Sequence, residues 1–260
     1  MGRIIALTNQ KGGVGKTTTA INLSAALGEA GQHVLLIDFD PQGNATTGMM
    51  KERLDPTLPT VYELLCGLAD ARDCIIEGVA AGVDLMPASV SLSGAEVELL
   101  ELDSIETKTQ LRDSIAGLRD MYDYILIDRP PSIGILTINA LTASDGAIIP
   151  VQCEFYALEG LRQVIETIRL IQTKLNPDLV IEGILMTMYN SRTRLSIQVV
   201  DTVRDTVKKE LNEHVFETMI PRNVRLAEAP SFGEPITVYD SASRGADSYR
   251  LLAAELLEKN

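Results

Sequence analysis

The sequence predicts an α/β fold with a doubly wound, mostly parallel sheet and helices on both faces. Short apolar runs alternate along the chain with longer segments of helical periodicity, which is typical of βαβ units. A glycine-rich turn joins the first apolar run to the first helical segment. The chain has 260 residues, of which 45% are hydrophobic, so it can bury a substantial core. We therefore expect a single domain over residues 1–260.

The first two strands and the helix between them are expected at the start of the chain. Residues 4–7 form the first apolar run, and helical periodicity extends over about 16–30. Gly31 can close this helix because glycine adopts a left-handed backbone easily. The second buried strand is expected over 34–37, and Pro41 prevents its simple continuation.

The remaining strands are expected at intervals along the chain, with helices between them. Two proline-containing stretches, 51–60 and 221–240, are expected to be irregular surface segments rather than domain linkers. The expected strands are residues 83–86, 124–127, 147–151, 181–188 and 215–220.

The composition excludes several kinds of site. The absence of tryptophan and the low count of phenylalanine argue against an aromatic platform for single-stranded nucleic acid. Three cysteines, Cys66, Cys74 and Cys153, give no disulfide framework, and the two histidines form no zinc motif. No apolar run is long enough to span a bilayer, and no signal-peptide pattern precedes the first strand. We expect a cytoplasmic protein.

The net charge of −13 argues against a simple basic surface for nucleic acid, but the charge is unevenly spread. Residues 1–185 hold 13 basic and 25 acidic side chains, whereas residues 186–260 hold 10 and 11. The acidic excess nearly vanishes in the last part of the chain. Arginines can therefore form a local basic surface there.

The glycine-rich turn has the features of a phosphate-binding loop. Residues 10–18 (QKGGVGKTT) lead directly from the first strand into the helix. Glycines let successive N–H groups face one anion, and the helix N-terminus adds positive charge. Lys16 would hold the β- and γ-phosphates, and Thr17 would bind Mg²⁺. Gln10 replaces the first glycine of the strict GxxxxGK[ST] pattern, and the glycine spacing of a dinucleotide-binding fold is missing. The expected nucleotide-binding residues are Lys11, Gly12, Gly13, Val14, Gly15, Lys16, Thr17 and Thr18.

The run KGGVGKTT resembles the deviant Walker A motif of the ParA/MinD family of P-loop ATPases. Over nearly its full length the chain resembles chromosomal ParA proteins of the Soj type. The resemblance implies a single P-loop ATPase domain without an N-terminal helix-turn-helix extension, so sequence-specific operator binding is not expected. The further matching runs are DFDPQGN (38–44), YILIDRPPSIG (124–134), QCEFYALEG (152–160) and IPRNVRLAEAPSFG (220–233).

The resemblance also implies roles in catalysis and metal binding. Lys11 matches the signature lysine that reaches the phosphates of a partner subunit, and Gly13 lies where the two loops approach. Asp40 matches the carboxylate that orients the attacking water, Asp128 matches the Walker B carboxylate, and Asp38 would support Mg²⁺ through water. As ordinary residues, these aspartates would cap strand ends or turns. The implied catalytic residues are Lys11, Lys16 and Asp40, and the implied magnesium ligands are Thr17, Asp38 and Asp128.

The resemblance assigns the loops in the last part of the chain to adenine and DNA. Asn190 and the segment Pro221, Arg222 and Asn223 match the family's base-binding positions, although such residues also occur in ordinary turns. Exposed arginines would contact DNA phosphates without reading sequence, and the alternative is a scatter of surface charges. The implied DNA-binding residues are Arg192, Arg194, Arg225 and Arg244.

Arg129 departs from the family pattern, in which a small residue, often cysteine, stands between the Walker B aspartate and two prolines. Its guanidinium adds a positive charge beside Asp128 and the phosphate site. Two positions are open for the side chain. It can pair with Asp128 or a neighbouring acid, which would slow hydrolysis, or it can point into solvent without effect.

The sequence therefore predicts an ATP-driven dimer switch for chromosome or plasmid partitioning. ATP and Mg²⁺ are the expected cofactors. The ATP-bound homodimer would bind nonspecific double-stranded DNA at the nucleoid, and a ParB-like centromere-binding protein would stimulate hydrolysis. One alternative is a MinD-like ATPase that cycles on membranes through its C-terminal helix. Residues 249–260 carry few basic side chains, however, and we expect their apolar stripe to pack on the domain. A P-loop metabolic ligase is a second alternative.

Overall fold

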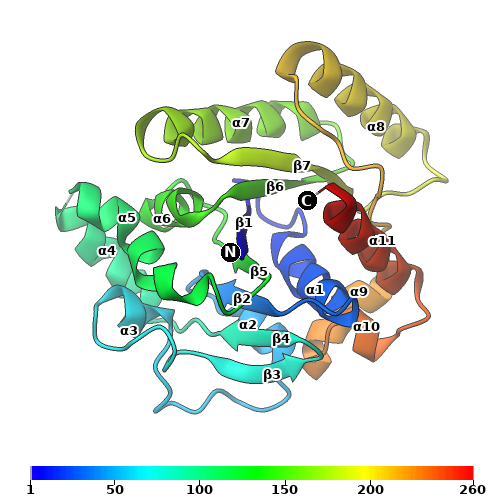
Figure 1. Ribbon diagram of the computed structural model, residues 1–260. Coiled ribbons are helices and arrows are strands. Elements are labelled where there is room, and N and C mark those ends of the chain that lie inside the picture. The colour runs from blue at the N-terminus through cyan, green and yellow to red at the C-terminus, as the bar shows by residue number, and fades with distance from the viewer. Residues whose placement is uncertain (1, 103, 260) are drawn as a thin grey trace.

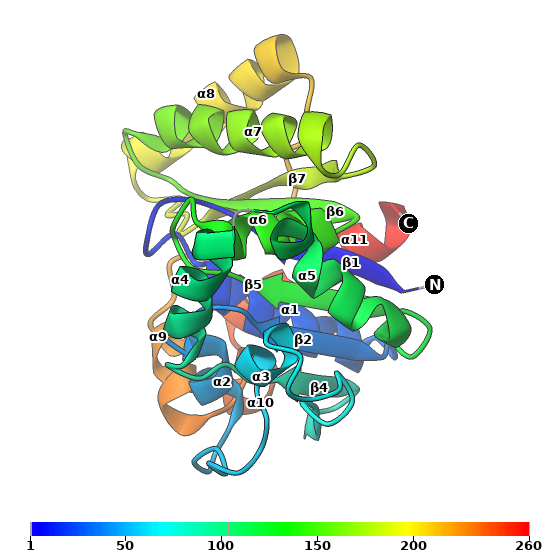
Figure 2. The same cartoon turned by 90° about the vertical axis from the view of Figure 1, so that its left-hand side faces the viewer.

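The computed structural model describes residues 2–102 and 104–259. Within them, the strands form one sheet in the order β3-β4-β2-β5-β1-β6-β7, and neighbouring strands are parallel except β3 with β4. Helices cover both faces of the sheet (Figure 1 and Figure 2), so the predicted fold class is confirmed. The strands are β1 (Arg3–Leu7), β2 (Val34–Asp38), β3 (Ile76–Ala80), β4 (Val83–Met86), β5 (Tyr124–Asp128), β6 (Gly146–Gln152) and β7 (Val180–Thr187).

The helices divide between the two faces of the sheet. Those in the described part of the chain are α1 (Lys16–Glu29), α2 (Asn44–Met49), α3 (Val61–Leu65), α4 (Leu92–Leu102), α5 (Ile105–Ile115), α6 (Ile135–Ala143), α7 (Ala157–Lys174), α8 (Arg194–Thr206), α9 (Val224–Glu228), α10 (Ile236–Tyr239) and α11 (Arg244–Lys259). Short 3₁₀- or π-type turns follow α5, α8 and α9. Figure 1 shows α3–α6 to the left of the sheet, and α1, α9, α10 and α11 to its right.

The central strands are buried on both faces because helices cover both. In β2, Val34 and Leu36 pack into the cluster that contains α1 and α11, whereas Leu35 and Ile37 pack against α3–α6. Side chains of a strand alternate between faces, so a strand covered on both sides reads as a continuous apolar run. The apolar pattern therefore predicts six of the described strands, with ends that differ by no more than one residue. The first helix ends at Glu29, and Gly31 has the expected left-handed φ of 85°.

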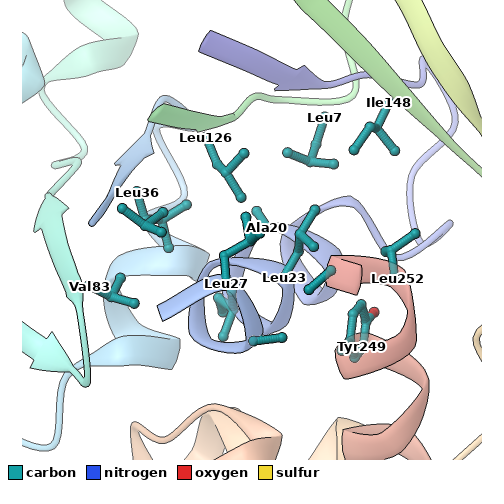
Figure 3. Packing of buried hydrophobic residues seen from close by; sticks show 14 of the residues in the cluster. Leu7, Ala20, Leu23, Leu27, Leu36, Val83, Leu126, Ile148, Tyr249 and Leu252 are labelled. Atoms are coloured by element: carbon teal, nitrogen blue, oxygen red, sulfur yellow. The ribbon is translucent and has the colours of Figure 1, made fainter. Parts of the chain in front are cut away.

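Helix α1 lies between the sheet and the C-terminal helix α11. Leu23 and Leu27 of α1 are buried in a cluster that also contains Leu252 of α11 (Figure 3). The Tyr249 hydroxyl lies 3.3 Å from the Thr19 hydroxyl and adds a polar contact within this cluster. The expectation that the C-terminal apolar stripe packs on the domain is confirmed. No helix in the described part of the chain has the length and apolar composition of a bilayer span.

Residues 215–220, expected as a strand, do not form one. The segment runs beside β7 in space, but it donates hydrogen bonds to that strand only through the N–H groups of Phe216 and Ile220, near its two ends. Between them, the N–H groups of Glu217 and Thr218 donate to the carboxylate of Glu255 on α11, at 2.7 and 3.0 Å. The prediction is wrong because a side-chain acceptor from a distant helix replaces the ladder.

The apolar pattern also misses β3. This short strand pairs antiparallel at the edge of the sheet, most of its residues are partly or fully exposed, and Gly78 has a left-handed φ of 67°. An edge strand of this kind has no continuous apolar run. The stretch 221–240, expected to be irregular, contains the short helices α9 and α10, whereas 51–60 is irregular as expected.

Gly28 of α1 generates a prediction about stability. A Cβ at Gly28 would overlap the carbonyl oxygen of Ala81, which lies in the turn between β3 and β4. We expect Gly28→Ala to lower the free energy of unfolding by about 1–3 kcal/mol, because overpacking against backbone is relieved only by moving the helix. Urea denaturation measures this change.

Gly160→Ala in α7 is the matched control. A Cβ at Gly160 would meet nothing within 4 Å. Alanine is the better helix former, so the free energy of unfolding of this variant should rise by about 0.5–1 kcal/mol. Equal effects of the two substitutions would contradict the close packing of α1 on the turn.

Candidate active site

The parallel register brings three chain segments together at the carboxyl edge of the sheet. Asp128, the last residue of β5, lies opposite Leu7 of β1 on one side and Asp38 of β2 on the other. The phosphate loop follows β1, and Asp40 follows β2. The structure therefore brings the loop and the three aspartates singled out from the sequence to one place.

The phosphate loop has the backbone that its glycines permit. Gly13 and Gly15 have φ values of 75° and 90°, in the left-handed region that other residues rarely adopt. Helix α1 begins at Lys16, and its first N–H groups have no partner within a helix. Together, these features give residues 11–18 the form of a single anion-binding cradle.

Side chains hold the loop to the neighbouring strands. The Asn9 amide donates to the Pro150 carbonyl of β6 at 2.7 Å, and its oxygen accepts from the Lys11 N–H at 3.0 Å. The Thr187 hydroxyl of β7 donates to the Val14 carbonyl at 2.8 Å. The cradle is thus fixed to the sheet before any ligand binds.

Lys16 points into the cradle as a desolvated cation. It is 6% exposed, and its ammonium donates to the Lys11 carbonyl at 3.3 Å. Burial lowers the pKa of Lys16 to about 8; the Arg129 guanidinium acts in the same direction, while Asp128 and Asp40 oppose it. A bound polyphosphate would favour the charged form of Lys16 again.

Asp128 and Thr17 fit a magnesium ion. Asp128 is fully buried, and neither of its carboxylate oxygens has a hydrogen-bond partner in the described part of the chain. Burial raises the pKa of Asp128 and the Asp38 carboxylate adds to the rise, whereas the nearby Thr17 hydroxyl and Lys16 ammonium oppose it. Mg²⁺ typically takes one or two carboxylates together with phosphate oxygens. An unpaired carboxylate beside a hydroxyl is such a donor set.

Asp38 and Asp40 are already engaged within the chain. Asp38 accepts from both the N–H and the hydroxyl of Thr46 at 2.7 Å, and from the Asp40 N–H at 3.2 Å. Burial raises the pKa of Asp38, and these hydrogen bonds oppose the rise. Asp40 accepts from the Gln42 N–H at 3.0 Å. Asp38 thus anchors the start of α2, and Asp40 combines a turn-capping bond with a position close enough to influence Lys16.

A cavity of about 340 Å³ adjoins the loop on the side of α11, and its lining includes Pro221, Arg222 and Asn223. Its size suits a small ligand group such as a purine base. Asn190, expected at the base, is not part of the lining, and its side-chain oxygen accepts from the Arg192 N–H at 3.0 Å. The full lining is Gly15, Thr18, Thr187, Met188, Ile220, Pro221, Arg222, Asn223, Val224, Leu226, Ala227 and Tyr249.

Sequence reasoning missed several residues of this lining, of which Met188 and Tyr249 are the most informative. Met188 directly follows β7 and has an unusual left-handed φ of 52°. Its place two residues before Asn190 is the signal that could have drawn attention to it. Tyr249 comes from α11, and no local pattern marks it, because only the packing of α11 against α1 brings its ring to the cavity.

Lys11 lies at the exposed tip of the loop. Its ammonium forms an ion pair with the carboxylate of Glu154 in the same chain. A Cβ at Gly13 would meet nothing within 4 Å, so the surface beside Lys11 is open. Phe155 and Tyr156, which follow Glu154, are 78% and 67% exposed, and their ring centroids lie 5.2 Å apart. A cation of the loop and two exposed aromatic rings thus share one surface.

The arginines singled out for DNA are all exposed. Arg192, Arg194 and Arg244 have no acidic partner within ion-pair distance among the described residues, whereas Arg225 pairs with two acidic side chains at 2.9 and 3.5 Å. Arg222 is also exposed, and its N–H donates at 3.0 Å to the loop that follows β7. This contact places the segments around Arg192 and Arg222 side by side.

Arg129 occupies neither of the two positions that the sequence left open. Its side chain is 1% exposed, and it forms no ion pair in the described part of the chain. The guanidinium instead donates to the hydroxyls of Thr8 and Thr137 and to two backbone carbonyls. Both expectations are wrong because neutral oxygen acceptors from three segments surround the group.

Comparison with known proteins identifies the family. The family model described as AAA domain matches residues 2–181. The chain is 53% identical to sporulation initiation inhibitor protein Soj of Bacillus subtilis, over 98% of each protein. It is 50% identical to chromosome partitioning protein ParA of Myxococcus xanthus, over 100% of this chain and 89% of that protein. The chain belongs to the ParA/Soj family of chromosome-partitioning ATPases.

Solved structures agree with the fold of this ParA-family ATPase. The cell division ATPase MinD of Pyrococcus furiosus has a TM-score of 0.80 and 26% identity over 100% of both chains. A cobyrinic acid a,c-diamide synthase of Mycobacterium smegmatis with bound ATP analogue and magnesium has a TM-score of 0.83 and 38% identity, over 99% of this chain and 95% of that one. The chain is less similar in sequence to this synthase than to Soj and ParA, so we assign its family from the partitioning proteins.

The lowered pKa of Lys16 predicts how ADP binding without Mg²⁺ depends on pH. Phosphates stabilise the ammonium form, so the pKa of Lys16 in the complex lies above the value of about 8 in the free protein. The contribution of Lys16 to affinity should be lost as pH rises through this value, by up to about tenfold per pH unit. Isothermal titration calorimetry with EDTA present measures the change.

Lys16→Arg is the control for this pH dependence. Arginine keeps its charge over the same range, so the fall in ADP affinity above about pH 8 should disappear in this variant. An affinity that falls equally in both proteins would assign the effect to another group.

Proposed function

We propose that this chain is an ATP-dependent dimer switch that binds nonspecific double-stranded DNA and partitions chromosomes or plasmids with a ParB-like partner. ATP binding would convert a monomer into a DNA-binding homodimer. Hydrolysis, stimulated by the partner, would return the monomer. The observation that carries the proposal is the surface around Lys11, where a cation of the phosphate loop lies beside two exposed aromatic rings.

ATP would occupy the cradle and the adjoining cavity together. Lys16 and the loop N–H groups would hold the phosphates, and the cavity that Tyr249 lines would receive the adenine. Thr17 and Asp128 would bind Mg²⁺, whose charge offsets that of the phosphates. Asp40 would accept a hydrogen bond from the attacking water and so orient it toward the γ-phosphate.

Lys11 gives a physical reason for hydrolysis to require two subunits. In the single chain its ammonium pairs with Glu154 at the surface, whereas Lys16 occupies the interior of the cradle. A second cation that a partner supplies would stabilise the charge of the transition state. Phe155 and Tyr156 provide aromatic area of the kind that interfaces use, and the open space beside Gly13 allows close approach.

The exposed arginines support binding to DNA phosphates. Arg192, Arg194, Arg225 and Arg244 are exposed and belong to segments where the acidic excess of the chain nearly vanishes. Arg225 is the one of the four that pairs with acidic side chains among the described residues. A few phosphate contacts from each subunit give weak, salt-dependent and sequence-independent binding. Because a dimer doubles these contacts, binding would depend on ATP.

Two other functions have less support. Membrane cycling through the C-terminal helix is disfavoured because Leu252 and Leu256 of α11 are buried against the domain rather than free for lipid. The diamide synthase name belongs to a protein of 38% identity, whereas partitioning relatives reach 53%. We therefore advance the partitioning function alone.

DNA binding tests the switch directly. We expect the protein with ATP to bind unrelated duplexes, and the protein with ADP or without nucleotide to bind at least about tenfold more weakly, because only the dimer presents both sets of arginines. The affinity should fall steeply with salt. Fluorescence anisotropy over a salt series, alongside the dimer fraction from analytical ultracentrifugation, gives both quantities. DNA binding that ignores nucleotide would rule out the switch.

Individual arginines test the proposed DNA surface. Arg192→Ala or Arg244→Ala should weaken binding equally for all sequences and reduce the slope of log affinity against log salt by about one for each phosphate that the variant no longer neutralises. Arg72→Ala, an exposed arginine between α3 and β3, is the matched control and should change neither quantity. An equal weakening by Arg72→Ala would show a general charge effect instead of a surface.

Two substitutions separate dimerisation from turnover. Lys11→Ala should abolish the ATP-dependent dimer and spare nucleotide binding, because Lys11 lies at the exposed tip of the loop. Asp40→Ala should keep the ATP-bound dimer and lower turnover by about 10² or more, because the water loses its orienting carboxylate. Sedimentation and phosphate release measure the two effects. Normal hydrolysis by Asp40→Ala would mean that another carboxylate orients the water.

A further inference from the structure

The Arg129 side chain joins three segments around the nucleotide site. Its Nε and Nη2 atoms donate to the Thr8 hydroxyl at 3.1 and 2.5 Å. Its Nη1 atom donates to the carbonyls of Pro130 and Ser132 at 2.8 and 2.9 Å, and to the Thr137 hydroxyl at 2.9 Å. One guanidinium therefore connects the end of β1, the loop 130–134 after β5, and the first turn of α6.

This arrangement needs the forked shape of arginine as well as its charge. Nε and Nη2 donate to Thr8, whereas Nη1 donates to the loop 130–134. A lysine has a single nitrogen and cannot reach both partners at once. Burying a charge among neutral acceptors alone is unfavourable unless each donor is satisfied. Among the described residues, Arg129 is nevertheless the largest fully buried side chain. We attribute the burial of this charged group to the way in which it connects the three segments.

Two of the three segments that Arg129 joins are continuous in sequence with the candidate site. Thr8 precedes Asn9, whose side chain holds the Lys11 N–H and fixes the loop to β6. On the other side, the Thr137 hydroxyl donates to the Ser132 carbonyl at 2.6 Å, which fixes the loop 130–134 to α6. A change at Arg129 would release the root of the phosphate loop and the loop after Asp128 together.

We propose that Arg129 is a positioning residue that braces the loop 130–134 against the root of the phosphate loop, so that both are ordered before ATP binds. The proposal rests on ATP binding in the cradle and is independent of DNA binding. A site that is ordered in advance does not have to order its loops when the ligand arrives, and it binds more tightly for that reason. Arg129 acts through Thr8, Ser132 and Thr137, and none of its contacts requires the nucleotide.

Arg129→Lys and Arg129→Gln test the brace in the full-length protein. Both should raise the dissociation constant for ATP by about tenfold, since neither side chain can span the three segments. Amide hydrogen exchange of the nucleotide-free protein should increase in residues 8–15 and 130–137 together, and ATP should restore protection in both. Normal ATP affinity in Arg129→Lys would show that charge suffices and would overturn the brace. Increased exchange in only one of the two segments would overturn it as well.

Arg119→Gln is the control for a purely structural effect. Arg119 is partly buried and pairs with Asp145 at 2.5 Å, but it hydrogen-bonds near the amino end of β1, away from the loop. We expect this variant to lower thermal stability without changing ATP affinity. If Arg129→Lys likewise changes only stability, Arg129 is a structural residue and the proposal fails.

Thr8→Val and Thr137→Val provide a second test if the arginine variants do not fold. Each removes one acceptor of the guanidinium while Arg129 remains, so each should raise the ATP dissociation constant by a few-fold, and the pair should be non-additive because they act on one group. Additive effects, or no effect, would contradict the brace. If the unmodified protein does not bind DNA in an ATP-dependent way, the proposed dimer switch is wrong. The proposal for Arg129 would still stand, because its tests measure ATP affinity and hydrogen exchange.

Discussion

The active site depends on the parallel register of β2, β5 and β1. Because Asp128 of β5 lies between Leu7 of β1 and Asp38 of β2, the register holds the carboxylates of Asp128 and Asp38 side by side against their mutual repulsion. A slip of one residue in β5 would turn Asp128 to the opposite face of the sheet. Burial of all three strands between helices makes such a slip unfavourable, and so the apolar core fixes the geometry of the polar site.

Local patterns predict the phosphate loop and the buried strands because each depends on neighbouring residues. Gly13 and Gly15 adopt left-handed backbones, and the strands are covered on both faces. The environment of Arg129 could not be predicted, because Thr8 reaches it from 121 residues away and two of its acceptors are backbone carbonyls that any residue supplies. Tyr249 and Glu255 were missed for a similar reason. Tyr249 lines the cavity and Glu255 accepts hydrogen bonds from the segment 215–220 only because α11 packs beside both.

The charged side chains form an exposed set on the surface and a buried set in the nucleotide site. The net charge of −13 describes the surface as a whole, whereas the nucleotide site contains the desolvated cations Lys16 and Arg129 beside the buried Asp128. Within this group Asp128 favours the charged form of Lys16, and Arg129 disfavours it. Under the proposed function, a polyphosphate and its metal ion would enter a site where cations and carboxylates already offset one another. The composition of the chain does not reveal this balance, because it counts exposed and buried groups alike.

Neither edge of the sheet offers a regular strand to another copy of the chain. On one side β3 is short, shifts its register and contains a left-handed Gly78, so it offers a poor template for another strand. On the other side the segment after α8 donates to β7 through Phe216 and Ile220 and covers that edge. Both edges thus resist strand addition, which is a common route to uncontrolled aggregation. The reversible association that we propose would therefore use the loops at the carboxyl edge, beside the nucleotide site.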